Sequence, residues 1–323
     1  MRSKEPKVKK VLVISLTNIG DVILTLPVMD ILRRDFKGAE LSVVIGPKAA
    51  SLLAHNPRLK KVYIYDKHQP VATTIRWVWE LRRQSFDLVV DLRNSFTPFL
   101  IAARRRTPAA KIRQEGLHMR EKHLQRLRTV HDYDPQKAKD SILYISSDDR
   151  KYVEHLLENA LGAKRSFVAI APGSAYHAKR WNEANFARLV EEINIRFQVP
   201  VVFVGDDKDS AFVRKINALL PIAEADLTGQ TTLIQLAELI ARSALIISND
   251  SAPMHLASYL NRPVLALFGP SDPLKYGPWS ETSGYVRAGG KEAAFDINTI
   301  TPQALVGRLD FDGKDFTVNE KSI

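Results

Sequence analysis

A polar turn, SNDSAPMH at residues 248–255, has the composition of an anion-binding site. It follows an apolar run at residues 244–247 and precedes another at residues 256–260, which predicts a strand, a turn and the start of a helix. Ser and Asp are good helix caps and Pro suits the first helical turn, so the backbone N–H groups there can bind an anion such as a nucleotide diphosphate. A capped helix start that binds no ligand is the alternative.

Small and basic residues follow a second expected strand, which ends at Ala171. Gly173, with Ser174 beside it, would let a ligand approach the backbone closely. Lys179 and Arg180 would neutralise a leaving diphosphate, because negative charge develops on that group in the transition state. A solvated basic loop is the alternative reading of this segment.

Two carboxylates also follow expected strands. Asp21 starts an amphipathic helix that extends to about Phe36, and it could accept the proton of a sugar hydroxyl as that hydroxyl attacks. Asp207 follows the apolar run at residues 201–204, where an acidic side chain could bind ribose hydroxyls. Each carboxylate could instead be a simple helix cap, and His255, beside the anion turn, could touch a donor or pack in the core.

Strand-length apolar runs alternate with helical patterns along the whole chain, and these elements must position the polar turns. The runs lie at residues 11–15, 41–45, 62–65, 88–91, 167–171, 201–204, 245–248 and 264–268. This alternation predicts an α/β architecture of parallel sheets covered by helices, and the runs form two groups of four. We expect two doubly wound domains, residues 1–164 and residues 165–323, with a short helix from Thr301 to Leu309 and a tail at the end. Because such sheets bind ligands at the carboxyl ends of their strands, the chemistry is expected in a cleft between the domains.

The composition of the 323-residue chain excludes several classes of protein. The absence of Cys rules out disulfides and thiolate chemistry, and the eight His residues lack metal-ligand spacing on any one helix face. The motifs of dinucleotide dehydrogenases, P-loop kinases, serine hydrolases and zincins are missing. No apolar run approaches the roughly 20 residues of a membrane span, so we expect a cytoplasmic protein.

The formal net charge of +11 is concentrated in two segments. Residues 1–10 carry five basic residues and one acidic residue, and residues 102–139 carry eleven basic and four acidic residues. The second segment includes Arg104, Arg105 and Arg106, and it suggests a local anionic partner. A solvated basic helix is the alternative, and nucleic acid is not expected because aromatic residues are poorly interleaved with the charges.

Four ordered blocks of the sequence resemble glycosyltransferase family 9, the ADP-heptose:lipopolysaccharide heptosyltransferases. The blocks are LTNIGDVILTLP at residues 16–27, APGS at 171–174 with KRW at 179–181, the turn at 248–255, and LFGPSDP at 267–273. The resemblance implies the GT-B architecture, in which two Rossmann-like domains face each other across a cleft. It also implies an N-terminal domain that binds the acceptor and a C-terminal domain that binds the nucleotide sugar.

The resemblance further implies a metal-independent, inverting transfer of heptose from ADP-heptose to the inner core of lipopolysaccharide, with no cofactor besides the donor. Asp21 matches the general base of the family. The donor-binding residues it implies, together with those suggested by the turns above, are Gly173, Ser174, Lys179, Arg180, Asp207, Asp250, Ser251, Ala252 and His255. Those expected on the acceptor side are Asn18, Gly20, Arg104, Arg105 and Arg106.

The basic segment also suggests contact with the phosphates of a lipopolysaccharide precursor, peripheral to the inner face of the inner membrane. Two other functions stay open at this point. One is a GT-B enzyme that uses another nucleotide sugar, including a UDP-sugar 2-epimerase, and the other is a non-catalytic protein that binds a nucleotide sugar.

Overall fold

The computed structural model of the chain describes residues 7–66, 68–101, 103–109, 116–137, 140–162, 166–289 and 295–319. The chain divides into two compact units, Met1–Tyr144 and Ile145–Ile323, which we call unit 1 and unit 2. The expected boundary at residue 164 lies outside the described residues. The helix before it, α6 (Ser147–Leu161), belongs to unit 2 and packs against α9 (Leu233–Arg242).

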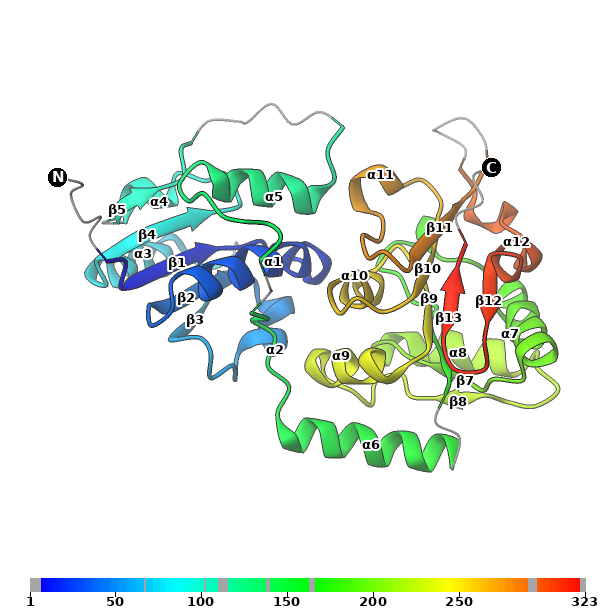
Figure 1. The fold of residues 1–323 in the computed structure, drawn as a ribbon. Helices are drawn as coiled ribbons and strands as arrows, with labels where there is room; N and C mark the ends of the chain where they lie inside the picture. Colours follow the sequence, from blue (N-terminus) through cyan, green and yellow to red (C-terminus); the bar gives the residue numbers. More distant parts are fainter. Residues whose placement is uncertain are drawn as a thin grey trace. The chain divides into compact units, whose positions relative to one another are not determined.

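Unit 1 is built on a parallel sheet whose described strands follow the order β3-β2-β1-β4-β5 (Figure 1). Its elements in chain order are β1 (Lys10–Ile14), α1 (Ile19–Asp35), β2 (Glu40–Ile45), α2 (Ala50–Leu53), β3 (Lys61–Ile64), α3 (Val71–Arg83), β4 (Phe86–Asp91), α4 (Thr97–Leu100), β5 (Ala103–Arg106) and α5 (Met119–Arg128). The strand order reverses at β1, which is the arrangement of a doubly wound sheet.

The loop after β1 is held in place by backbone packing. Gly46, which follows β2, donates its N–H to Leu16 O at 3.1 Å. A Cβ at Gly46 would lie 2.6 Å from the Cα of Thr17, so no larger residue fits there without moving the loop. The hydroxyl of Ser15, just after β1, also lies 2.7 Å from the hydroxyl of Thr25 in α1, and both side chains are buried. The start of α1 is therefore fixed against two neighbouring strands.

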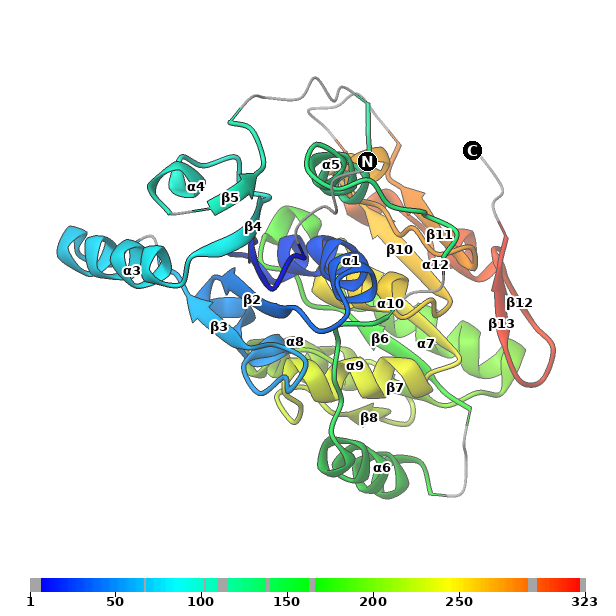
Figure 2. The same ribbon diagram turned by 60° about the vertical axis from the view of Figure 1, so that its left-hand side comes forward.

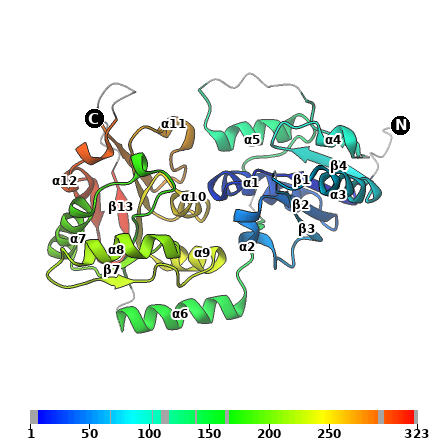
Figure 3. The same cartoon turned by 180° about the vertical axis from the view of Figure 1, so that it is seen from behind.

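Unit 2 contains a six-stranded parallel sheet in the order β11-β10-β9-β6-β7-β8, within the part of the chain that the structure describes. After α6, its elements are β6 (Val168–Ala171), α7 (Glu183–Phe197), β7 (Val201–Phe203), α8 (Ser210–Asn217), β8 (Ala225–Asp226), α9, β9 (Leu245–Asn249), α10 (Ala252–Tyr259), β10 (Val264–Phe268), α11 (Pro273–Tyr276), β11 (Ser283–Arg287), α12 (Pro302–Val306), β12 (Leu309–Phe311) and β13 (Phe316–Val318). Figure 3 shows α7 and α8 side by side, in agreement with their packing contact.

A buried tryptophan anchors the segment that precedes α7. Trp181 is 0% exposed, its ring packs edge-on against Phe186 with centroids 5.0 Å apart, and its Nε1 donates to Ile300 O at 3.0 Å. The next residue, Asn182, caps α7 by accepting from the N–H of Asn185. These contacts fix the backbone next to the preceding basic residues, Lys179 and Arg180.

The expected α/β class and parallel sheets are confirmed, and each of the eight apolar runs forms or overlaps a strand. The sequence analysis missed β5, β8, β11 and the antiparallel pair β12 and β13. The expected helix from Thr301 to Leu309 is wrong at its end, because α12 stops at Val306 and Leu309 begins β12. The expected tail therefore contains a small hairpin. Among the helices described here, none combines the length and the apolar character that crossing a membrane requires.

Candidate functional site

The loops after β6 and β9 lie together at one edge of the unit 2 sheet. The two strands are hydrogen-bonded neighbours, with Ala171 opposite Ser248, so both chains leave the sheet at their carboxyl ends side by side. Asn249 is fully buried and its Nδ2 donates to Pro172 O at 2.7 Å, which ties one loop to the other. The structure thus brings the segment of Gly173 and Ser174 next to the turn at residues 248–255.

An ion pair joins the two loops where a ligand is expected. Lys179, in the short 3₁₀ turn His177–Lys179, places its Nζ 2.6 Å from Asp250 Oδ2. The Asp250 side chain is 7% exposed and that of Lys179 is 28% exposed, so the carboxylate lies inside and the ammonium nearer to solvent. This geometry holds Lys179 at the edge of the sheet, where its charge is available to an anion.

The helix α10 begins at Ala252, shortly after Asp250 in the chain. Ser251 is the N-cap in extended conformation, but its side chain does not accept a bond from the first turn of the helix and instead lies 3.1 Å from the hydroxyl of Ser248. Ala252 and Pro253 form the first turn, as the sequence predicted. The cap therefore leaves the first-turn N–H groups to other acceptors, which is the arrangement an anion site uses.

His255 is buried rather than open to this edge. It is 5% exposed and its ring stacks on Trp279, with centroids 5.8 Å apart and an interplanar angle of 26°. Of the two roles that the sequence left open, this geometry is that of a packed histidine. A contact between His255 and a donor stays a prediction.

Arg180 and Asp209 brace the loop after β6. Arg180 Nη2 donates to Ser174 O at 2.9 Å and lies 3.9 Å from Asp209 Oδ1. A Cβ at Gly173 would collide with the Asp209 carboxylate, so the close approach that this glycine allows is made by Asp209. A Cβ at Gly205 would also come within 2.6 Å of the same carboxylate. Burial and the neighbouring charge of Asp206 raise the pKa of Asp209.

Asp207 lies on the exposed side of the same turn. It begins the 3₁₀ turn Asp207–Asp209, for which Asp206 is the cap and Asp209 completes a capping box. Gly229, with a positive φ of 73°, packs closely against the backbone of Asp207. Asp209 is thus the carboxylate of this turn that faces the β6 loop, and the sequence analysis missed it. The signal that could have found it is the D-x-x-D spacing of a reciprocal cap.

In unit 1, the expected base Asp21 lies in the first turn of α1. It is half-buried, and its Oδ2 accepts a hydrogen bond of 3.0 Å from Nδ2 of the exposed Asn18. Gly20 lies between them on the same turn. The carboxylate stands at the carboxyl end of β1, as expected, and is open enough to meet a hydroxyl.

A second carboxylate of unit 1, Asp91 at the end of β4, is fully buried. It accepts from the N–H groups of Arg93 and Ser95 at 2.9 and 2.6 Å and from the Ser95 hydroxyl. Burial raises its pKa, and these hydrogen bonds oppose the rise. The backbone carbonyl of Asp91 accepts from the buried Arg126, whose Nη2 also donates to Pro108 O at 2.8 Å. Asp91 and Arg126 therefore shape the loops at this edge.

The three arginines of the basic segment form most of β5. Arg104 and Arg106 are exposed, whereas Arg105 is half-buried on the other face of the strand. Within the same segment α5 packs on α1 and buries His123, Arg126 and Leu127, so this basic helix is solvated on one face only. Lys111, Arg113, Glu115 and Lys139 of the segment lie outside the described residues.

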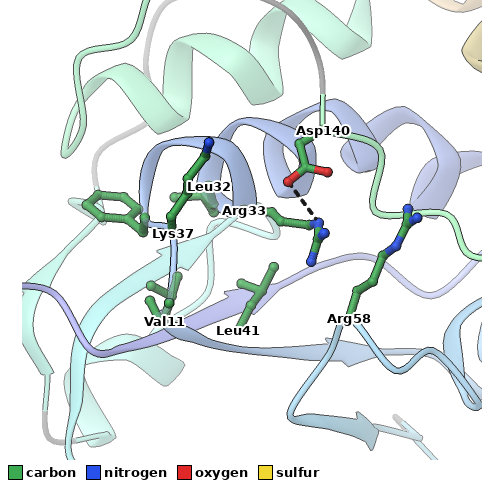
Figure 4. A pocket seen from close by; sticks show the side chains of 10 residues that line it. Val11, Leu32, Arg33, Lys37, Leu41, Arg58 and Asp140 are labelled. Carbon is green, nitrogen blue, oxygen red and sulfur yellow. Dashed lines mark ion pairs between the residues drawn. The ribbon is translucent and has the colours of Figure 1, made fainter.

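The expected site residues are separate from a cavity in unit 1 that has a volume of ≈ 270 Å³ (Figure 4). That cavity lies at the amino-terminal ends of β1 and β2, between Val11 and Leu41, and an ion pair of 3.1 Å joins Arg33 to Asp140 across it. None of the expected donor or acceptor residues lines it. Within the described residues, no group of three or more acidic and histidine side chains has the geometry to hold a metal ion.

Residues 75–303 match the family model described as glycosyltransferase family 9 (heptosyltransferase). The chain is 28% identical over 295 residues to lipopolysaccharide heptosyltransferase 3 of Escherichia coli K12, which covers 81% of this chain and 83% of that protein. The structure resembles a family 9 glycosyl transferase from Veillonella parvula, with a TM-score of 0.82 at 21% identity and coverage of 95% and 97%. It also resembles the ADP-heptose heptosyltransferase II of E. coli, with a TM-score of 0.75 at 25% identity and coverage of 92% and 96%.

Proposed function

Because the chain belongs to glycosyltransferase family 9, a family of heptosyltransferases, we propose that it transfers heptose from ADP-heptose to the inner core of lipopolysaccharide. The chain is a glycosyltransferase with the α/β architecture of the GT-B heptosyltransferases to which it is similar. The finer assignment of donor, acceptor and catalytic residues rests on the geometry of the two sheet edges.

The observation that carries the donor assignment is the ion pair of Lys179 and Asp250 beside the start of α10. Negative charge grows on the ADP oxygen as its bond to the sugar breaks, and a positive charge held nearby stabilises that change. We assign the diphosphate to Lys179, Arg180 and the N–H groups of Ser251 and Ala252. Asp250 would orient Lys179 and meet the sugar, while Asp207, Gly173, Ser174 and His255 would complete the donor site.

Asp21 is the proposed general base. In an inverting transfer the acceptor hydroxyl oxygen forms a bond to the anomeric carbon as the bond from that carbon to the ADP oxygen breaks. Asp21 would take the hydroxyl proton, and the electron pair of the broken bond would leave with ADP. Asn18 donates a hydrogen bond to Asp21 and would keep the other oxygen of the carboxylate directed at the acceptor. The proposed reaction is metal-independent and needs no cofactor besides the donor.

The acceptor side is assigned to Asn18, Gly20 and the arginines of β5. Arg104 and Arg106 are exposed, and guanidinium groups bind phosphate and carboxylate groups well. Such groups occur on a lipopolysaccharide core, so we expect contact with this acceptor and with the anionic surface of the membrane that carries it. Nucleic acid is not an expected partner.

Binding and turnover together test the proposal. A ligand at 100 times its Kd stabilises a protein by about 2.7 kcal/mol, so ADP-heptose and ADP should raise the melting temperature while UDP-sugars and NAD should not. ADP release should then depend on an added lipopolysaccharide core acceptor. Stabilisation by a UDP-sugar would replace the donor, and donor binding without ADP release on any acceptor would make the protein a non-catalytic binder.

A further inference from the structure

Exposed apolar side chains gather on two neighbouring helices of unit 1. Large apolar residues are 44 to 77% exposed at five positions, namely Ile75, Trp79, Phe96, Phe99 and Leu100. They lie on α3, on α4 and just before α4, and these two helices contact each other. Figure 2 shows α3, α4 and β5 as neighbours at one end of the unit 1 sheet, and we call the five residues the apolar patch.

The exposure on α3 is not the result of a loosely packed helix. Leu81 is 0% exposed, and the ring of Trp77 packs on that of Tyr65 with centroids 5.1 Å apart, so one face of α3 is anchored on the sheet. Ile75 and Trp79 are four residues apart and share the opposite face. A stable helix that presents a tryptophan and an isoleucine to solvent has a face suited to another apolar medium.

Arginines surround this patch. Residues 71–106 carry seven arginines and three acidic residues, and one of the acidic residues, Asp91, is buried. Arg106 stacks over the ring of Phe99 at 4.6 Å, so a positive charge lies directly against the apolar patch. The other exposed arginines of these elements are Arg76, Arg82, Arg83 and Arg104. A surface of this kind is complementary to one with negative head groups above an apolar layer.

We propose that the apolar patch and its arginines form the surface by which this protein binds an anionic lipid bilayer. Tryptophan and phenylalanine would enter the interface between head groups and acyl chains, and the arginines would pair with lipid phosphates. The choice of a lipid partner rests on the proposed function, because a lipopolysaccharide precursor is itself held in a membrane. The inference adds to that function the elements that face the membrane, α3 and α4.

Co-sedimentation with vesicles tests the surface without any donor or acceptor. The full-length protein should bind vesicles of phosphatidylcholine with 30% phosphatidylglycerol, bind vesicles of phosphatidylcholine alone much more weakly, and lose affinity as salt is added. The double variant Trp79→Ser with Phe96→Ser should bind the anionic vesicles at least tenfold more weakly. The matched control is Ile195→Ser with Ile222→Ser, which removes two apolar residues of unit 2 that are 78 and 81% exposed, and it should bind like the wild type.

Tryptophan fluorescence locates the contact. Brominated lipids should quench the wild type on binding, and Trp79→Phe, which keeps an apolar ring, should bind normally but lose most of that quenching. Failure of the wild type to bind anionic vesicles, or equal binding by the double variant, would overturn the proposal. A dimer in solution that the double variant dissolves, without vesicle binding, would assign the patch to a second copy of the chain instead. ADP release with a delipidated acceptor should be unchanged in the double variant, so the outcome is separable from the proposed chemistry.

Discussion

The two sheets hold their polar edges in different ways. At the unit 2 edge, charged side chains connect the loops to one another, through Lys179 with Asp250 and Arg180 with Ser174 O and Asp209. At the unit 1 edge, the loop of Asp21 is positioned by backbone packing against Gly46. Unit 2 therefore holds a positive charge beside the start of α10 through side-chain contacts, whereas unit 1 presents the half-buried carboxylate of Asp21 on a loop held by its backbone.

Replacement of Asp21 should give the largest effect and should distinguish the role of the unit 1 edge from that of the unit 2 edge. Asp21→Asn should lower the rate of heptose transfer by about 10² to 10⁴, because it removes the proposed base, while the Kd for ADP should not change. Steady-state ADP release and calorimetry measure the two quantities. Asn18→Ala keeps the base and removes its hydrogen-bond partner, so its loss of rate should be below about tenfold. An Asp21→Asn enzyme that turns over normally would remove Asp21 from the reaction.

Replacement of Lys179 should affect both stability and donor binding. Lys179→Met leaves the largely buried Asp250 without its partner at 2.6 Å, and we expect a loss of about 2 kcal/mol in the free energy of unfolding. The Kd for ADP should rise about tenfold or more. The double variant Lys179→Met with Asp250→Asn should recover the stability in urea titrations without recovering the affinity. Recovery of both quantities would mean that Lys179 has only a structural role.

Acid should act on unit 1 through His123. Burial, followed by the charge of Arg126, lowers the pKa of His123 to about 4. Since the unfolded chain has the ordinary value of about 6.5, it binds more protons than the folded chain between these values, and stability falls as the pH falls through this window. The expected loss in the free energy of unfolding from pH 7 to pH 5 is about 2 kcal/mol, which urea titrations at the two pH values would measure. His123→Gln should remove this difference, and the exposed control His155→Gln should keep it.

The titration of Asp209 in unit 2 should change the free energy of unfolding in the opposite direction to that of His123. We expect the effect to be smaller. Its raised pKa means that the folded chain binds the proton more readily, so protonation of this group favours the folded state as the pH falls. Asp209→Asn keeps the volume and the hydrogen bond from Asp206 N–H but loses the attraction to Arg180, so the Kd for ADP should rise about fivefold, or ~1 kcal/mol. The difference in the Kd for ADP between Asp209→Asn and the wild type should become smaller as the pH falls. A difference in Kd that does not change with pH would argue against an effect of the Asp209 charge.

The sequence was sufficient for elements whose pattern is local. Strands β1, β4 and β9 are apolar runs, and Pro253 lies in the first turn of α10 where the cap signals predicted it. It was insufficient for β5, whose residues are ARRR, because an edge strand can be held by backbone pairing with β4 and shows no apolar pattern. The strand β8, with two residues, is too short to have a pattern.

The site could be predicted only in part, because local patterns identify single residues but not the contacts between distant segments. Lys179 and Asp250 lie 71 residues apart in sequence and were each assigned from their own turns, yet their direct pairing follows only from the adjacency of β6 and β9. The role of Asp209 depends on two glycines in separate loops, and the burial of Arg126 depends on Asp91 and Pro108. Interactions of this kind belong to the tertiary structure, and no single segment contains them.

The space that Asp209 occupies has a consequence for how this protein can evolve. Gly173 and Gly205 both lack the one carbon atom that would collide with its carboxylate, so a Cβ at either position would require the Asp209 side chain to move. A smaller residue at position 209 would make room for a side chain at position 173 or 205, and it would remove the contact with Arg180 while the hydrogen bond from Arg180 to Ser174 O remains. The three positions are therefore coupled, and the effect of a substitution at one depends on the residues at the other two.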